Sequence, residues 1–282
     1  MTTSLGTYLG TRLGTELGTG SDESTELQRL ELYLAQNLFS WMRADYRTEA
    51  ASKVTAFQDK VLLPSQGGLA GNARSIDANH AYSQATGVNQ VAAITGSSLL
   101  NNREAGVYVG NHGYTSTLGE ASWRFVRDGT STTSAFIFAA TSTASAARVA
   151  DTFQAGTPYY EILLHAGVAG DMRSRVFNNA AFAFINTANT GAALNAPQYV
   201  LQQYNEAASP KQQCFENHAL VSNAAPSAAP SAAAGLTMAL GGARSGAAFT
   251  GHLAEAMFST VYTAALKTAI DRYVTLRYGG VV

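Results

Sequence analysis

Cysteine and charge are scarce in this sequence, and each scarcity excludes a class of protein. The single cysteine, Cys214, cannot form a disulfide within the chain, so we expect a buried thiol rather than a disulfide-stapled secreted module. Charged residues make up 13% of the chain, and 18 basic side chains are balanced by 19 acidic ones. No basic stripe marks a phosphate-binding surface, so no nucleic acid partner is expected.

Long apolar runs are also missing. No segment reaches the roughly 18 apolar residues of a membrane span, and no basic segment leads into an apolar core of the kind that directs export. We therefore expect neither a membrane partner nor an export signal. Hydrophobic residues nevertheless make up 46% of the 282 residues, which predicts a globular chain with room for one large β domain or two ordinary domains.

The first segment with a clear pattern is a repeat near the N-terminus. Residues 4–21, SLGTYLGTRLGTELGTGS, contain Leu-Gly-Thr four times at a spacing of four. A helix is disfavoured because each Gly costs about 1 kcal/mol relative to Ala. In an extended chain the leucines share one face and Tyr8 lies with the glycines on the other. We predict an assembly arm over 1–21 whose contacts come from Leu5, Leu9, Leu13, Leu17 and Tyr8.

This arm has too little apolar surface to order itself. Burial of four leucines yields roughly 6–12 kcal/mol, whereas fixing about 20 backbones costs on the order of 20–40 kcal/mol. An ordered arm must therefore form contacts with another surface, for example by adding a strand to the edge of a sheet. The alternative is a flexible low-complexity leader.

Beyond the arm, local patterns predict a helix followed by many short strands. Residues 22–40 place leucines at helical intervals after Thr25 and Gln28, which have capping-box spacing. From residue 41 onward, short apolar or alternating runs are separated by turn residues, which is typical of a sandwich or barrel. The predicted strands cover 106–110, 122–129, 134–141, 159–167, 173–179, 181–186, 198–205 and 235–242.

The C-terminal part is predicted to contain a loop and a closing helix. Residues 222–235, SNAAPSAAPSAAAG, have small side chains and prolines, and indicate a flexible loop between strands. Thr263 is the expected N-cap of the last helix and Gly279 its stop. Leu266, Ile270, Tyr273 and Val274 share one face of this helix.

The segment from residue 236 to residue 279 resembles the end of laminin-G-like, concanavalin A-like sandwich domains. These domains close with a glycine-ended strand, a small-residue turn, a strand containing Phe-x-Gly and a glutamate, and a helix ending in Tyr-Gly. The matching residues are Leu240, Gly241, Gly242, Phe249, Gly251, Leu253, Ala254, Glu255, Leu266, Tyr273, Tyr278 and Gly279. The resemblance also covers the opening strand pair, where the matching residues are Trp41, Ala44, Asp45, Val54, Phe57 and Asp59.

This resemblance implies a mainly β chain: a jelly-roll sandwich of two antiparallel sheets over 41–282. The amphipathic helix over 22–40 would connect the sandwich to the arm, and a second helix would close the chain. The glycosidases with this fold carry Glu-x-Asp-x-Glu on one strand, because a retaining mechanism needs two adjacent carboxylates. That motif does not occur in this sequence, and no acidic, Asn and His cluster of the legume-lectin type occurs either.

Other chemistry has little support in the sequence. His80, His112, His165, His218 and His252 have neither His-x-x-x-His spacing nor a neighbouring cysteine, so we expect surface or structural roles and no metal. No P-loop, dinucleotide fingerprint or Gly-x-Ser-x-Gly occurs, so we expect no cofactor and no enzyme activity. Glu255 is expected to be structural, bonded to backbone or an arginine.

One loop is a candidate glycan site. The stretch NHGYTS, 111–116, combines amide, imidazole and aromatic groups, and Asn111, His112 and Tyr114 could contact a sugar by hydrogen bonding and stacking. The alternative is a polar hairpin tip without a ligand.

These features together predict a non-enzymatic structural protein of a virus particle. The favoured hypothesis is a bacteriophage capsid decoration protein, assembled in the host cytoplasm, homo-oligomeric, and held to other virion proteins by its arm. A tail or fibre subunit is the next hypothesis within that class. The alternative is a lectin-like, carbohydrate-binding module for host adhesion. An enzyme would need two carboxylates brought together by the fold.

Overall fold

The structure is a computed structural model of the chain, and it describes eleven segments between residues 23 and 279. These are 23–61, 80–110, 112–128, 130–142, 147–152, 160–164, 172–177, 182–186, 194–224, 237–241 and 249–279. The predicted arm over 1–21 lies outside the described residues.

The described residues are mainly β, with two long helices. The helices are α2 (Glu23–Asn37), α3 (Phe125–Asp128) and α4 (Ala264–Tyr278), with 3-10 turns η3 (Gly87–Asn89), η4 (Ser98–Leu100) and η5 (Glu120–Trp123). The strands are β1 (Ser40–Ala50), β2 (Lys53–Asp59), β3 (Ala81–Ser83), β4 (Ala92–Ser97), β5 (Arg103–Tyr108), β6 (Tyr114–Ser116), β7 (Ser131–Ala140), β8 (Ala147–Asp151), β9 (Tyr160–Leu164), β10 (Met172–Phe177), β11 (Phe182–Asn186), β12 (Gln198–Asn205), β13 (Gln212–Glu216), β14 (Ala219–Ala224), β15 (Ala239–Leu240) and β16 (Gly251–Ser259).

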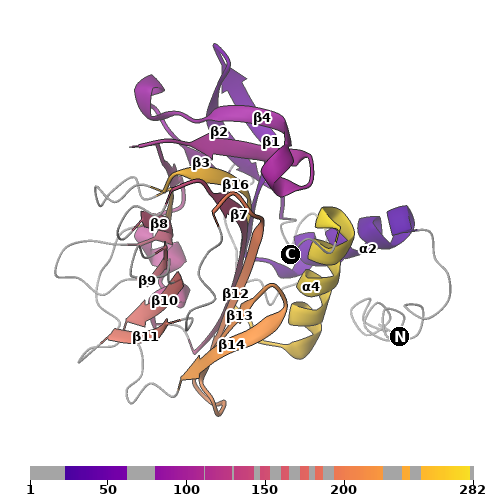
Figure 1. Cartoon of the computed structure of the whole chain (residues 1–282). Coiled ribbons are helices and arrows are strands. Elements are labelled where there is room, and N and C mark those ends of the chain that lie inside the picture. The colour runs from indigo at the N-terminus through magenta and orange to yellow at the C-terminus, as the bar shows by residue number, and fades with distance from the viewer. Residues whose placement is uncertain are drawn as a thin grey trace, which may run out of the picture.

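These strands form one antiparallel sheet that folds back on itself into two layers. Its order is β11-β10-β9-β8-β15-β6-β3-β2-β1-β16-β7-β12-β13-β14, with β5 also paired to β16 and β4 paired to β5. The strands β8 to β11 lie in one layer and β7, β12, β13 and β14 in the other, as Figure 1 shows. Every described pairing is antiparallel, including the predicted opening pair β1–β2. The predicted β-sandwich is therefore confirmed.

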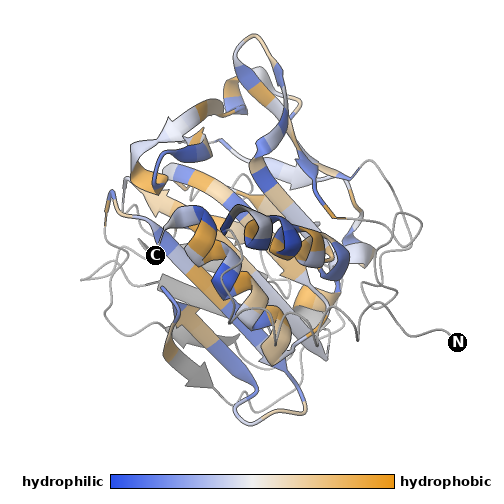
Figure 2. Cartoon of the chain, turned by 90° about the vertical axis from the view of Figure 1, so that its right-hand side faces the viewer, coloured by the Kyte–Doolittle hydropathy of each residue, from blue (hydrophilic) through white to orange (hydrophobic). Residues whose placement is uncertain are grey.

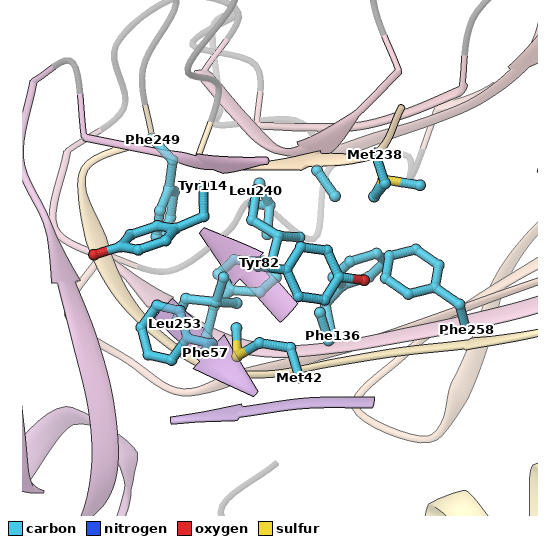
Figure 3. Packing of buried hydrophobic residues seen from close by; sticks show 14 of the residues in the cluster. Met42, Phe57, Tyr82, Tyr114, Phe136, Met238, Leu240, Phe249, Leu253 and Phe258 are labelled. Carbon is cyan, nitrogen blue, oxygen red and sulfur yellow. The ribbon is translucent and has the colours of Figure 1, made fainter. Parts of the chain in front are cut away.

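The main core lies between the two layers. Tyr82, Tyr114 and Leu240 reach in from one layer, and Phe136 and Phe258 reach in from the other. Figure 3 shows these side chains packed against one another. Aromatic rings meet edge to face here, for example those of Phe136 and Phe258 at 5.5 Å between centroids. Burial of this set holds the layers together.

A second core lies between the β1–β16–β7–β12 face and the helices. Leu34 of α2 and Ile270 of α4 pack with Trp41, Ile137 and other side chains from the outer face of this layer. In Figure 2 both helices lie in front of the sheet. Within the described residues, no helix has the length and apolar character needed to cross a membrane.

The closing helix follows its sequence signals. Thr263 is the N-cap of α4, because its hydroxyl accepts a hydrogen bond from the Leu266 N–H. Gly279 ends the helix in the left-handed region, at φ +73°. Ile270 and Tyr273 are buried on the predicted face. All of these predictions are confirmed.

The first helix is also confirmed, but the capping box predicted at Thr25 and Gln28 is wrong. α2 begins at Glu23, so Thr25 lies inside the helix and is not the cap of a capping box. The acidic residues Glu23 and Glu26 occupy the first turn, where a carboxylate interacts favourably with the helix dipole. Leu30 and Leu34 face the sheet as expected.

The strand predicted over 122–129 is wrong. This stretch forms η5 and α3, and its buried residues Trp123 and Val126 are three apart, which is the helical period. The strand predicted over 235–242 is much shorter, because only Ala239 and Leu240 pair. Strands are present within the other predicted ranges. The loop predicted over 222–235 begins inside β14, and its remainder, from 225, lies outside the described residues.

Candidate functional site

Two loops at one end of the sandwich form the candidate site, and we call them the loop pair. They are the segment 84–89 after β3 and the described residues 109, 110, 112 and 113 between β5 and β6. The Gln84 side chain donates from Nε2 to the Gly113 carbonyl at 2.7 Å, and the Gly113 N–H donates to the Asn89 carbonyl at 3.3 Å. These bonds fix the two loops side by side.

Further hydrogen bonds within the first loop hold its shape. Gln84 Oε1 accepts the Thr86 N–H at 2.9 Å, and Gln90 Nε2 donates to the Gln84 carbonyl at 2.7 Å. The Asn89 N–H donates to the Thr86 carbonyl at 2.9 Å, which closes the η3 turn. Because these bonds already order the loop, little conformational entropy of the loop is lost when a ligand binds here.

The loop pair presents apolar side chains to solvent. Val88 is 80% exposed and Val109 is 56% exposed, each on one of the two loops. Gly110 follows Val109 at φ +60°, a left-handed conformation that Gly adopts without strain. Exposed apolar groups beside polar loop atoms match the mixed character of a ligand-binding surface.

His112 supplies the candidate polar contact. Its Nδ1 accepts the Val109 N–H at 3.1 Å, so the neutral ring carries its proton on Nε2. The imidazole is partly buried, and no described residue forms a hydrogen bond with Nε2. Within the described residues this N–H has no acceptor, and it can donate to a ligand. Asn111, predicted to act beside it, lies outside the described residues.

Tyr114, the third predicted contact, lies in the core, and its prediction as a glycan contact is wrong. Its hydroxyl donates to the Val54 carbonyl at 2.6 Å and accepts the Val91 N–H at 2.9 Å. Its ring packs edge to face on Phe57 at 4.9 Å, as Figure 3 shows. Burial raises the pKa of this hydroxyl to about 12. Tyr114 is therefore a core residue whose hydroxyl bonds to Val54 and Val91 rather than to a ligand.

Sequence reasoning missed the first loop of the pair. The stretch Thr-Gly-Val-Asn, 86–89, is a recognisable turn signal. Nothing in the local pattern shows that it lies beside residues 109–113, because that contact depends on the pairing of β3 with β6. The exposed Val88 also gave no signal, since a single surface valine is ordinary.

A buried Ser-His-Asp trio was also missed. His80 Nδ1 bonds to Asp59 Oδ2, and His80 Nε2 lies 2.8 Å from Ser116 Oγ. This is the connectivity of a serine-hydrolase triad, in which the carboxylate orients the imidazole and the imidazole accepts the hydroxyl proton. The three residues come from the end of β2, the residue before β3, and β6, so only the sheet brings them together.

The surroundings of Ser116 give this trio a structural role. Ser116 Oγ accepts the Trp123 indole N–H at 2.8 Å and the Leu118 N–H at 3.1 Å, so both of its lone pairs are occupied. A nucleophilic hydroxyl needs a lone pair directed at the substrate and a route to it, but Ser116 is 5% exposed and His80 is 1% exposed. The expectation that His80 is a structural histidine is borne out.

Glu255 is structural as predicted, and an arginine is among its partners. Its carboxylate accepts the Trp41 indole N–H at 2.7 Å and the hydroxyls of Tyr273 and Tyr278 at 2.6 and 2.7 Å. Arg277 Nε lies 2.9 Å from Oε1 as an ion pair, at an angle that makes no hydrogen bond. Burial and the Glu255 charge raise the pKa of both tyrosines. The cluster fastens α4 to the sheet.

The remaining histidines have protein partners or lie outside the described residues. His252 Nδ1 lies 2.6 Å from Ser97 Oγ, and His218 Nδ1 lies 3.3 Å from Asp271 Oδ1. His165 lies outside the described residues. In the part of the chain that the structure describes, no group of three or more His, Cys, Asp or Glu side chains is placed to hold a metal ion.

Comparison with known proteins gives a likeness of fold. No protein-family model and no curated protein matches the sequence. A Trypanosoma rangeli sialidase in complex with 2,3-difluoro-KDN matches 85% of this chain at a TM-score of 0.53 and 9% identity, over 32% of its own length.

Two smaller structures are also similar. Domain 4 of a Geobacillus stearothermophilus arabinanase with arabinotriose has a TM-score of 0.48 and 9% identity, over 64% of this chain and 80% of its own. The carbohydrate-binding module of a Ruminococcus gnavus sialidase with sialyllactose has a TM-score of 0.44 and 13% identity, over 53% of this chain and 85% of its own.

Proposed function

We propose that this chain is a carbohydrate-binding domain and that the loop pair is its glycan site. The observation that carries the proposal is the arrangement of His112. Its ring is held by the Val109 N–H, its Nε2–H has no partner among the described residues, and the same two loops expose Val88 and Val109. A sugar offers hydroxyl oxygens to such a donor and C–H surface to the valines.

The fold supports a glycan as the ligand class, since a sialidase shares it over most of the chain. The fold alone does not assign a function, so the site geometry decides between this proposal and other classes. The alternative hypothesis, a virion component held by its N-terminal arm, rests on residues that the structure does not describe. It stays a prediction with a test of its own.

A glycan array with the full chain tests the proposal. We expect specific binding to a defined set of glycans, weakened roughly 3- to 10-fold by His112→Asn, because one hydrogen bond is lost. Asn is chosen because its side-chain oxygen can replace Nδ1 as the acceptor of the Val109 N–H, while Nε2 is removed.

The matched control is His218→Asn, in the β13–β14 turn at φ +69°, which Asn tolerates. This variant should bind like the wild type. Absence of specific binding by the wild type, or equal binding by His112→Asn, would contradict the proposal.

A further inference from the structure

The inner face of β7, β12 and β13 changes character along its length. At one end it carries Phe136 and Val200, which belong to the core between the layers. At the other end it carries Ser134, Gln202 and Gln212. The register proves the shared face, because Val200 pairs with Phe136 and Gln202 pairs with Ser134.

Gln202 and Gln212 are diagonal neighbours on this face. Gln202 pairs with Cys214, and Tyr204 pairs with Gln212. Gln212 lies two residues from Cys214 on the same strand, so it shares the face of Cys214 and Gln202 and lies diagonally across from Gln202. Diagonal positions lie roughly 7–8 Å apart between Cα atoms. Their amides are therefore close enough to contact one small molecule.

Both amides are buried without partners among the described residues. Gln202 and Gln212 are 0% exposed, and neither the nitrogen nor the oxygen of either side chain forms a hydrogen bond with a residue that the structure describes. Buried polar groups are almost always hydrogen-bonded, and each exception needs an explanation such as an enclosed ligand or water. Here four polar atoms on one face lack partners in the part of the chain that the structure describes.

We propose that Gln202 and Gln212 form an enclosed site for a small, neutral, hydroxyl-rich molecule between the two layers. Each amide offers donors and an acceptor, which suits hydroxyl groups that both donate and accept. Neither amide carries charge, so a charged ligand would be buried without compensation from them. The site is separate from the loop pair and does not depend on the proposed function.

Thermal unfolding of the full chain with neutral probes tests this site. The probes are glycerol, myo-inositol and D-galactose, and glucose 6-phosphate is the charged comparison. Binding should raise Tm with the logarithm of probe concentration, by roughly 3 °C for each tenfold increase above Kd. A polyol that acts only by exclusion from the protein surface instead raises Tm in proportion to its concentration.

Three variants assign the effect to these residues. Gln202→Leu and Gln212→Leu should lose the logarithmic rise, while their Tm without probe should equal or exceed that of the wild type, because an unpaired buried amide is removed. Gln213→Leu is the matched control, since its side chain lies on the other face and bonds to Tyr262. It should keep the rise, as should His112→Asn, which separates this site from the loop pair.

The proposal is overturned if no neutral probe gives the logarithmic rise in the wild type, or if Gln202→Leu keeps it. Should either leucine variant fail to fold, the side-chain amide signals of the 15N-labelled wild type decide. Two glutamine NH2 pairs should shift on titration with the probe that raises Tm. If none shifts, the amides are bonded to enclosed water only and the site is not a ligand site.

Discussion

At the scale of single residues, the described polar groups of the core are mostly bonded to one another. Ser116 is the densest example, because one hydroxyl contacts His80, Trp123 and the Leu118 N–H. Removal of such a hydroxyl lowers the free energy of unfolding chiefly because it leaves the buried hydrogen-bond donors around it without an acceptor. The same connectivity in an open cleft would make a nucleophile, so the surroundings and not the residue types decide the role.

Ser116→Ala is expected to destabilise the fold. It leaves the Trp123 indole N–H and the Leu118 N–H without their acceptor in a buried site, and we expect a loss of about 2–4 kcal/mol in the free energy of unfolding. Urea denaturation measures this loss. A variant as stable as the wild type would show that these donors find other partners.

Residue roles were predictable from the sequence only where a motif fixed the residue's surroundings. Glu255 lies in a family-like strand, and its structural role was predicted correctly. The sequence pattern places Tyr114 in a polar loop, whereas the structure places it at the start of β6. There its side chain is buried on the same face of the strand as Ser116. The face that a three-residue strand buries depends on its partner strands, and no local pattern reports them.

At the scale of elements, periodic segments were predictable and short ones were not. α4 has its cap, its apolar face and its stop in local sequence, and each was found where expected. The stretch 122–129 is apolar but short, so helix and strand could not be separated by pattern alone. β15 is two residues long because only Ala239 and Leu240 meet their neighbours.

The turn after β15 should be sensitive to one added methyl group. Gly241 has φ +81°, and a Cβ there would lie 2.5 Å from the ring of Tyr108. We expect Gly241→Ala to cost about 2–4 kcal/mol, from backbone strain and overlap together.

The control is Gly119→Ala, where φ is −66° and a Cβ meets nothing within 4 Å. This change should be neutral or slightly stabilising. Equal stability of the two variants in thermal unfolding would contradict the close approach at Gly241.

The attachment of α2 should weaken in acid. Glu31 accepts hydrogen bonds from Arg43 at 2.8 Å and Lys60 at 2.9 Å. Burial alone would raise its pKa, but the Lys60 hydrogen bond and the Arg43 charge outweigh burial and lower the pKa below its ordinary value of 4.5. A lowered folded-state pKa stabilises the protein above the unfolded pKa, and this contribution is lost as pH falls through the folded value.

The free energy of unfolding should therefore decline as pH drops below about 4.5, and Glu31→Gln should decline less steeply while being less stable near neutrality. Gln28→Ala, on the exposed face of the same helix, is the control and should follow the wild-type profile. Parallel profiles for Glu31→Gln and the wild type would refute the role of this carboxylate.

At the scale of the whole molecule, the fold depends on contacts between distant segments. The sheet order joins β2 to β3 and β3 to β6, and these pairings assemble both the loop pair and the Ser116 cluster. A resemblance in sequence predicted the sandwich, but strand order and loop neighbours are non-local and were not predictable from the patterns of this chain. The virion hypothesis and the arm remain predictions.

Deletion of residues 2–20 tests the arm. If the arm is an anchor that only a partner orders, as predicted, the truncated protein should keep the wild-type Tm and lose incorporation into a particle or association with a partner. Sedimentation with and without the partner particle measures this. Unchanged incorporation would reject the arm as an anchor.

The central claim is that the loop pair binds a glycan, and chemical-shift mapping tests it most directly. The 15N-labelled full chain is titrated with the strongest ligand from the glycan array. We predict that the largest backbone shifts fall within 84–89 and 109–113, together with the imidazole signals of His112. Saturable binding with the largest shifts elsewhere, and none in the loop pair, would contradict the account.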